Sequence, residues 1–138
     1  MSEVYLETSA VLTWLLGQSR AEEVRAAVDG AQAVVTSLLT FAEAERALVR
    51  AEREASLRAG DAQKLRGLLQ RARAAWIGMA VSEEILERAA RPFPVEPVRT
   101  LDGIHLATAL AFTKAFPDLR MLTFDRRIAA NAEALGIE

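Results

Sequence analysis

Hydrophobic positions along the chain fall into short apolar runs separated by longer segments with the three-to-four residue spacing of amphipathic helices. The short runs predict β-strands at residues 3–6, 31–37, 75–81 and 120–124. The intervening pattern predicts helices at residues 8–16, 19–28, 39–57, 60–73, 82–90, 100–116 and 125–134. Three of the four prolines lie in residues 91–100, which predicts a loop. Strands that alternate with helices favour a parallel sheet covered on both faces, so we expect one α/β domain over residues 1–138.

The composition narrows the chemistry that this domain can perform. Cysteine is absent, which excludes disulfides, thiolate metal sites and a thiol nucleophile. Any metal would therefore need oxygen ligands or the single histidine. No apolar run has the length of a membrane span, and the N-terminus lacks a signal-peptide pattern, so we expect a cytoplasmic protein.

Charge is distributed unevenly along the chain. The net charge is −2, which argues against a generally basic nucleic-acid binder. Residues 46–73 nevertheless carry a basic stretch, composed of Arg46, Arg50, Arg53, Arg58, Lys64, Arg66, Arg71 and Arg73. This stretch predicts either a local basic surface or a solvated helix face with ion pairs such as Arg50 with Glu54.

Four carboxylates lie either directly after a predicted strand or in the early turns of a predicted helix. Glu7 and Asp125 come directly after strands, with Thr123 shortly before Asp125. Glu43 lies about two turns into the helix after residues 31–37, and Asp102 occupies the first turn of its helix, where we expect Thr100 to be the cap. Functional groups of open parallel sheets gather at the carboxyl ends of the strands, so these acids are expected to meet at one edge.

Each acid also has a simpler interpretation. Asp102 and Asp125 are common helix-start residues, and Glu43 alone would fit a solvated helix face, whereas Glu7 is a poor cap. Considered jointly, four neighbouring carboxylates repel one another unless a cation lies between them. Oxygen ligands favour hard cations, so the sequence predicts a Mg²⁺ or Mn²⁺ site.

At these positions the chain resembles the PIN-domain ribonucleases of the VapC type, which are the toxins of toxin–antitoxin pairs. The motifs that carry the resemblance occur in the family's order and cover nearly the whole length. They are "YLETSAVL", "TSLLTFAEAERAL", "RTLDGIHLATAL" and "LTFDRRIAANAEALG".

The resemblance implies a PIN-like three-layer α/β fold and metal-dependent hydrolysis of RNA to products with a 5′-phosphate and a 3′-hydroxyl. It assigns the catalytic and metal-binding acids to Glu7, Glu43, Asp102 and Asp125. It also implies polar support from Thr8, Ser9 and Thr123. The implied partners are an RNA substrate, a small VapB-like antitoxin and a second copy of the chain in a homodimer.

One residue departs from the family pattern, because Glu7 stands where the family usually has Asp. The longer side chain predicts a displaced or water-mediated ligand, or an enzyme of reduced activity. The alternative to a working ribonuclease is therefore a weakened PIN-fold module that acts by binding antitoxin or RNA. A phosphotransfer domain is disfavoured, since we find neither the acidic pair nor the lysine that it needs.

Two further residues lie one helical turn from the acids. His105 follows Asp102, and the family resemblance predicts a supporting role for it. Arg46 follows Glu43 and is expected either to orient that carboxylate or to contact a phosphate. Trp14 and Trp76 are expected to pack in the core.

Overall fold

The computed structural model describes residues 2–138, and Met1 of the expected domain lies outside the described residues. Seven helices and four strands alternate along this part of the chain. The strands are β1 (Val4–Leu6), β2 (Val34–Ser37), β3 (Ile77–Met79) and β4 (Arg120–Leu122). The helices are α1 (Thr8–Leu15), α2 (Ala21–Gly30), α3 (Leu38–Arg53), α4 (Ala59–Ala75), α5 (Glu83–Ala89), α6 (Thr100–Phe112) and α7 (Arg126–Ala134).

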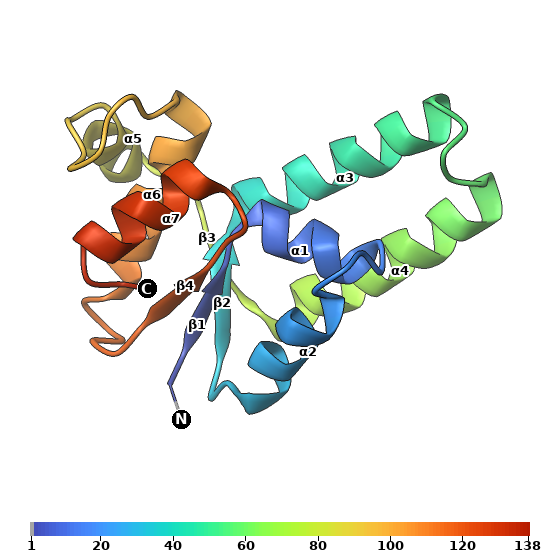
Figure 1. Ribbon diagram of the computed structural model, residues 1–138, viewed down its shortest axis with the longest axis horizontal. Helices are drawn as coiled ribbons and strands as arrows, with labels where there is room; N and C mark the ends of the chain where they lie inside the picture. The colour runs from blue at the N-terminus through green and yellow to red at the C-terminus, as the bar shows by residue number, and fades with distance from the viewer. Residues whose placement is uncertain (1) are drawn as a thin grey trace.

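The four strands form one parallel sheet in the order β3-β2-β1-β4, which confirms the predicted α/β class. Helices α1 to α4 lie on one side of the sheet and α5 to α7 on the other (Figure 1). Because all strands run the same way, their carboxyl ends share one edge, and the edge is lined by the starts of α1, α3 and α7.

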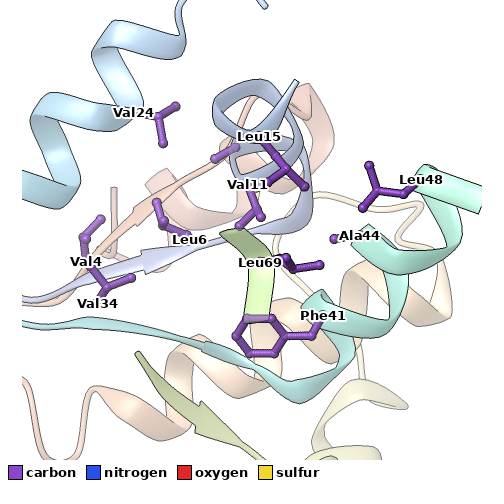
Figure 2. Close-up of a cluster of buried hydrophobic side chains, with 11 residues drawn as sticks. Val4, Leu6, Val11, Leu15, Val24, Val34, Phe41, Ala44, Leu48 and Leu69 are labelled. Atoms are coloured by element: carbon purple, nitrogen blue, oxygen red, sulfur yellow. The ribbon is translucent and has the colours of Figure 1, made fainter. Parts of the chain in front are cut away.

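Alternation along β1 divides the hydrophobic core between the two faces. Val4 and Leu6 pack into the cluster under α1, α3 and α4, where Phe41 and Leu69 also lie (Figure 2). Tyr5 points to the opposite cluster with residues of α6 and α7. Both clusters are buried, so β1 is held from two sides and the residue that follows it, Glu7, is firmly placed.

The aromatic residues on the α4 side are packing residues, as predicted. The rings of Trp14 and Trp76 have centroids 5.7 Å apart, and Trp76 also lies 6.2 Å from Phe41. They join α1 and α3 to the end of α4.

Helices α3 and α4 form a hairpin that projects away from the sheet (Figure 1). Leu48 and Leu69 are fully or almost fully buried between them. Ser37 caps α3, since its Oγ accepts a hydrogen bond from the amide of Leu39 at 3.1 Å. The first turns of α3 consequently lie at the carboxyl edge of the sheet, and its end lies far from that edge.

Several predicted boundaries and one predicted cap were wrong. Strands β2 and β3 are shorter than the predicted 31–37 and 75–81, α2 begins and ends two residues later than predicted, and α6 ends at Phe112 and not at residue 116. Helix α6 has Arg99 at its N-cap and begins at Thr100, so Thr100 is not the cap and no side chain caps this end. Helix α3 ends at Arg53 and not at residue 57. Strand β4 ends at Leu122, because the next residues turn away to bond with side chains at the start of α1 and no longer extend the ladder.

Candidate active site

The carboxyl edge of the sheet places the four predicted acids around one region. Glu7 directly follows β1, Glu43 lies in α3, Asp102 is in the first turn of α6, and Asp125 precedes α7. The charges of the other three acids raise the pKa of Asp102, so each of them lies within electrostatic range of Asp102. All four acids therefore lie at the predicted edge of the sheet, although no three of them in residues 2–138 are close enough to form a ligand group.

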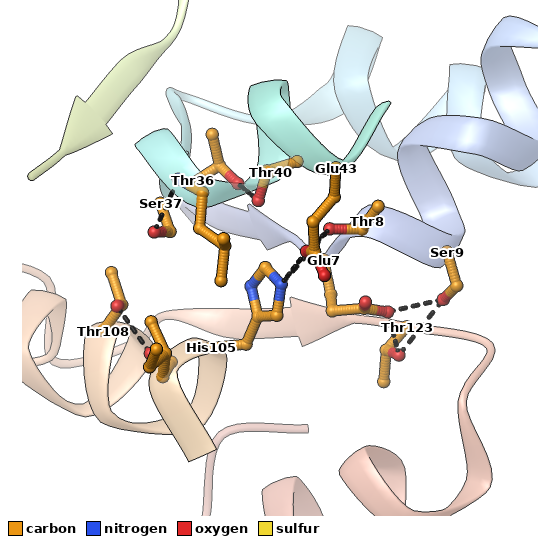
Figure 3. A network of polar contacts seen from close by, with 12 residues as sticks. Glu7, Thr8, Ser9, Thr36, Ser37, Thr40, Glu43, His105, Thr108 and Thr123 are labelled. Atoms are coloured by element: carbon orange, nitrogen blue, oxygen red, sulfur yellow. Dashed lines mark hydrogen bonds and ion pairs between the residues drawn. The ribbon is translucent and has the colours of Figure 1, made fainter. Parts of the chain in front are cut away.

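Glu7 occupies the N-cap position of α1 and yet does not cap it. Its Oε1 accepts hydrogen bonds from Ser9 Oγ at 2.5 Å and from Thr123 Oγ1 at 2.6 Å (Figure 3). The side chain is only 5% exposed. This geometry agrees with the sequence-based prediction that Glu7 is a poor helix cap.

The hydroxyls around Glu7 are themselves tied to the backbone that leads to α7. Ser9 Oγ accepts from the amide of Phe124 at 2.8 Å, and Thr123 Oγ1 accepts from the amide of Asp125 at 3.1 Å. The start of α1 and the loop after β4 are thus joined through two hydroxyls and one carboxylate. Both predicted support residues on this side, Ser9 and Thr123, therefore contact one of the four acids, Glu7.

Glu43 is held by a second polar network. Its Oε1 accepts from Thr8 Oγ1 at 2.5 Å and lies 2.7 Å from His105 Nε2 (Figure 3). Burial of the Glu43 carboxyl favours its neutral form, but the hydrogen bonds from His105 and Thr8 outweigh burial and hold its pKa below the usual value. Glu43 is therefore an ionised carboxylate at neutral pH.

A buried tyrosine fixes the orientation of the histidine. Tyr5 Oη lies 2.8 Å from His105 Nδ1, and both side chains are almost fully buried. Burial, assisted by the charge of Glu7, raises the pKa of Tyr5, so the phenol keeps its proton. The phenol then donates to Nδ1, which leaves Nε2 to donate to Glu43. Sequence reasoning missed Tyr5, because the first strand gives no signal that one of its residues reaches the α6 helix.

Asp102 differs from the other acids in having no hydrogen bond from any residue in the range 2–138. Burial raises its pKa, and the negative charges of Asp125 and Glu7 raise it further, with a smaller opposing effect of His105. Its surroundings therefore disfavour the charged form of the Asp102 carboxyl when no cation is bound.

Asp125 lies beside Asp102 and also caps the last helix. Its Oδ1 accepts from the amides of Arg127 at 2.9 Å and Ile128 at 3.1 Å. This confirms the helix-start interpretation of Asp125 without excluding a second role, since Oδ2 takes no part in the cap.

A groove at this point is lined by both aspartates and three arginines. The arginines are Arg99, Arg126 and Arg127. They were not predicted, although the sequence "DRR" after β4 was an available signal.

The oxygen donors fit a hard divalent cation, but they are not assembled into a closed cage. Within residues 2–138 no three acids or histidines are close enough to form a ligand group. Glu7 and Glu43 each have one oxygen engaged by hydroxyl or imidazole donors, and their Oε2 atoms have no hydrogen bond to this part of the chain. Mg²⁺ commonly binds through one or two carboxylates and keeps several waters, which an open arrangement of this kind permits.

Arg46 does not orient Glu43. It is exposed on α3, and neither a hydrogen bond nor an ion pair joins the two side chains among the described residues. The first of its two predicted roles is thus wrong, and contact with a phosphate stays a prediction.

The fold and the acids at its edge define a three-layer α/β domain with a carboxylate-rich site. The family model for the PIN domain matches residues 4–134, and the chain belongs to this family. The resemblance drawn from the four sequence motifs is therefore confirmed.

Curated relatives cover the chain almost completely. It is 32% identical over 138 residues to Ribonuclease VapC46 of Mycobacterium tuberculosis, with 99% of this chain and 95% of the relative covered. It is 29% identical over 136 residues to Ribonuclease VapC35 of the same species, with 97% and 93% covered.

Solved structures agree on the fold. The sarcin-ricin loop cleaving toxin VapC20 of Mycobacterium tuberculosis superimposes with a TM-score of 0.65 at 16% identity, covering 92% of this chain and 93% of that one. A toxin–antitoxin complex from Klebsiella pneumoniae gives a TM-score of 0.64 at 18% identity, with 91% and 90% covered. No helix in residues 2–138 is long and apolar enough to cross a membrane.

Proposed function

We propose that this chain is a ribonuclease that hydrolyses phosphodiester bonds of RNA as the toxin of a toxin–antitoxin pair. The observation that carries the proposal is the groove in which Asp102 and Asp125 lie beside three arginines, with no hydrogen-bond donor to the Asp102 carboxyl in the described part of the chain. The relatives named as VapC ribonucleases give the reaction class. They do not favour the alternative of a binding module without activity.

A divalent cation, Mg²⁺ or Mn²⁺, fits the donor set. Asp102 and Asp125 line one groove and would bind it directly, while Glu7 and Glu43 would act directly or through water. A bound cation would supply charge neutralisation at the scissile phosphate and lower the pKa of a metal-bound water.

The residues of the chain have distinct tasks in this proposal. His105 and Thr8 hold Glu43 ionised and in one orientation. Ser9 and Thr123 hold Glu7 in place through its Oε1. The arginines beside Asp102 and Asp125 would contact RNA phosphates, because their charges face the same groove as the two acids.

Three further elements belong to the proposal. The toxin–antitoxin complex among the structural neighbours supports an antitoxin protein as the partner. A homodimer and a cytoplasmic location are consistent with a toxin that acts on cellular RNA, and both are proposed on the family pattern alone.

The test is cleavage of RNA by the purified full chain. We expect cleavage with Mg²⁺ or Mn²⁺, none with EDTA, and loss of at least about a hundredfold in kcat/KM for Asp102→Asn, about 2.7 kcal/mol in activation free energy. Asp118→Asn removes the same charge from an exposed turn and serves as the matched control. Cleavage that persists in EDTA, or that survives Asp102→Asn undiminished, would refute the proposed site.

A further inference from the structure

The basic stretch at residues 46–73 is not used by the site described above, and two of its arginines on α4 make other contacts. On α4, Arg66 forms an ion pair with Glu52 at 3.0 Å, and the guanidinium of Arg73 lies 5.5 Å from the ring centroid of Phe41. These arginines connect the two helices of the hairpin. They are therefore accounted for by packing and pairing.

The arginines of α3 are different. Arg46, Arg50 and Arg53 are all exposed, and none forms an ion pair in the described part of the chain. The alternative that Arg50 pairs with Glu54 is thus wrong. Three neighbouring positive charges without partners repel one another, which makes the surface favourable for a polyanion.

The spacing of these arginines places them on one continuous stripe. Positions i, i+4 and i+7 share a helix face, and together they line a shallow groove with Val49 and Glu54. The stripe begins one turn after Glu43. Since α3 rises about 1.5 Å per residue, the distance from Glu43 to Arg53 is about 15 Å along the helix.

The direction of α3 connects this stripe to the site. The helix begins at the carboxyl edge of the sheet and leads outward along the hairpin (Figure 1). Arg99, Arg126 and Arg127 lie instead beside Asp102 and Asp125. A strand bound at the acids and extended along α3 would meet further positive charges as it leaves the site.

The composition of the groove favours RNA over a protein partner. Val49 is its only apolar lining residue, so it offers no pocket for the apolar anchors on which protein interfaces depend. Phosphate contacts, by contrast, need only positioned positive charges and give affinity without sequence preference.

We propose that Arg46, Arg50 and Arg53 form a track on α3 that binds the phosphates of single-stranded RNA on one side of the scissile bond. This inference rests on the proposed ribonuclease function. Arg46 and Arg53 lie about 10 Å apart along the helix, so the track accommodates roughly three nucleotides at the rise of about 3.4 Å of a stacked strand. Substrates that extend beyond the site on this side should consequently bind more tightly than short ones.

The experiment measures binding of oligouridylates of about 4 and about 12 nucleotides to the full chain in EDTA, where cleavage is suppressed. The track variant is Arg50→Gln with Arg53→Gln. The matched control is Lys64→Gln with Arg71→Gln, which removes the same charge from exposed positions of α4. Melting temperatures of all proteins verify that the substitutions leave the fold intact.

For the longer RNA, the slope of log K against log salt should fall by about 1.4 in the track variant, since each phosphate contact on a single strand contributes about 0.7. The ratio of the parent's binding constant to that of the track variant should therefore fall about sevenfold between about 50 and about 200 mM salt. Binding of the short RNA should lose less affinity in the track variant than binding of the longer RNA, and the control should keep the parent's slope.

Three results would overturn the track. They are an unchanged slope in the track variant, an equal loss in the control, and absence of length-dependent binding in the parent. If polyglutamate of matched charge binds as tightly as the RNA and loses affinity in the same variant, the face is a site for acidic protein segments and the RNA assignment is wrong. Failure of the ribonuclease proposal is distinguishable, because a parent that binds long RNA through the track without cleaving it in Mn²⁺ retains the track and loses the enzyme.

Discussion

Replacement of Asp102 by asparagine should stabilise the metal-free protein at pH 7. The folded-state pKa of this acid is raised, so its ionisation costs folding free energy once the pH exceeds the unfolded value of 3.8. The cost is absent below that value, grows as the pH rises toward the folded-state pKa, and is constant above it. The asparagine side chain is neutral and close in shape, and the carboxylate that it replaces makes no hydrogen bond within residues 2–138 that could be lost. The melting temperature of Asp102→Asn in EDTA at pH 7 should accordingly exceed that of the parent.

A bound cation should make the parent more stable than Asp102→Asn. An ion that binds only the folded parent at a hundredfold excess over its dissociation constant stabilises it by about 2.7 kcal/mol. For a domain of this size, that corresponds to a rise in melting temperature of roughly 10 °C. Asp102→Asn removes a charged ligand, so its shift should be a small fraction of this value.

The assay is thermal unfolding of the parent, Asp102→Asn and the control Asp118→Asn, each in EDTA and in Mn²⁺, between about pH 4.5 and pH 8. The advantage of Asp102→Asn in EDTA should shrink toward the acid end of this range, whereas Asp118→Asn should follow the parent throughout. The reasoning fails if Asp102→Asn destabilises the protein in EDTA and leaves the Mn²⁺ shift intact.

Two further predictions concern the polar contacts of Glu7. Thr123→Val removes a donor to the Glu7 carboxylate and leaves the Asp125 amide without its acceptor, so urea unfolding should show a loss of about 1–3 kcal/mol that Thr123→Ser largely restores. Equal stability of the two variants would contradict the hydrogen-bond network. Glu7→Asp should retain RNA cleavage because the charge is kept, whereas Glu7→Ala should lower kcat/KM about tenfold to a hundredfold. Full activity of Glu7→Ala would show that this carboxylate takes no part in the site.

The order and type of every helix and strand could be predicted from the sequence, because apolar periodicity and breakers act locally. The division of Val4, Tyr5 and Leu6 between two cores follows from strand alternation alone. The predicted end of β4 was wrong because side-chain hydrogen bonds there replace backbone pairing. Thr123 and Phe124 continue the apolar pattern of β4, but their bonds to side chains at the start of α1 end the strand before them.

The meeting of the four acids was predictable for a different reason. Parallel strands bring residues at their carboxyl ends together whatever the intervening sequence, so Glu7 and Asp125 had to share an edge. The hydrogen bonds among the hydroxyls were not predictable, because they depend on side-chain rotamers. It was also not predictable that Arg66 forms an ion pair whereas Arg50 forms none in the described part of the chain, since this depends on how α4 packs against α3.

The position of Glu7 explains how a longer acid is accommodated after β1. With one more methylene than aspartate, the carboxylate extends beyond the N-cap position and meets hydroxyls from both α1 and the loop after β4. Both hydroxyls bond the same oxygen, which restrains the additional rotatable bond that would otherwise disorder a ligand. The second oxygen has no hydrogen bond within residues 2–138 and is not a buried unpaired atom, so it is accessible at the edge where Asp102 lacks a neutralising partner. The glutamate is thus restrained at one oxygen and accessible at the other, which is the arrangement that its proposed role as a ligand would need.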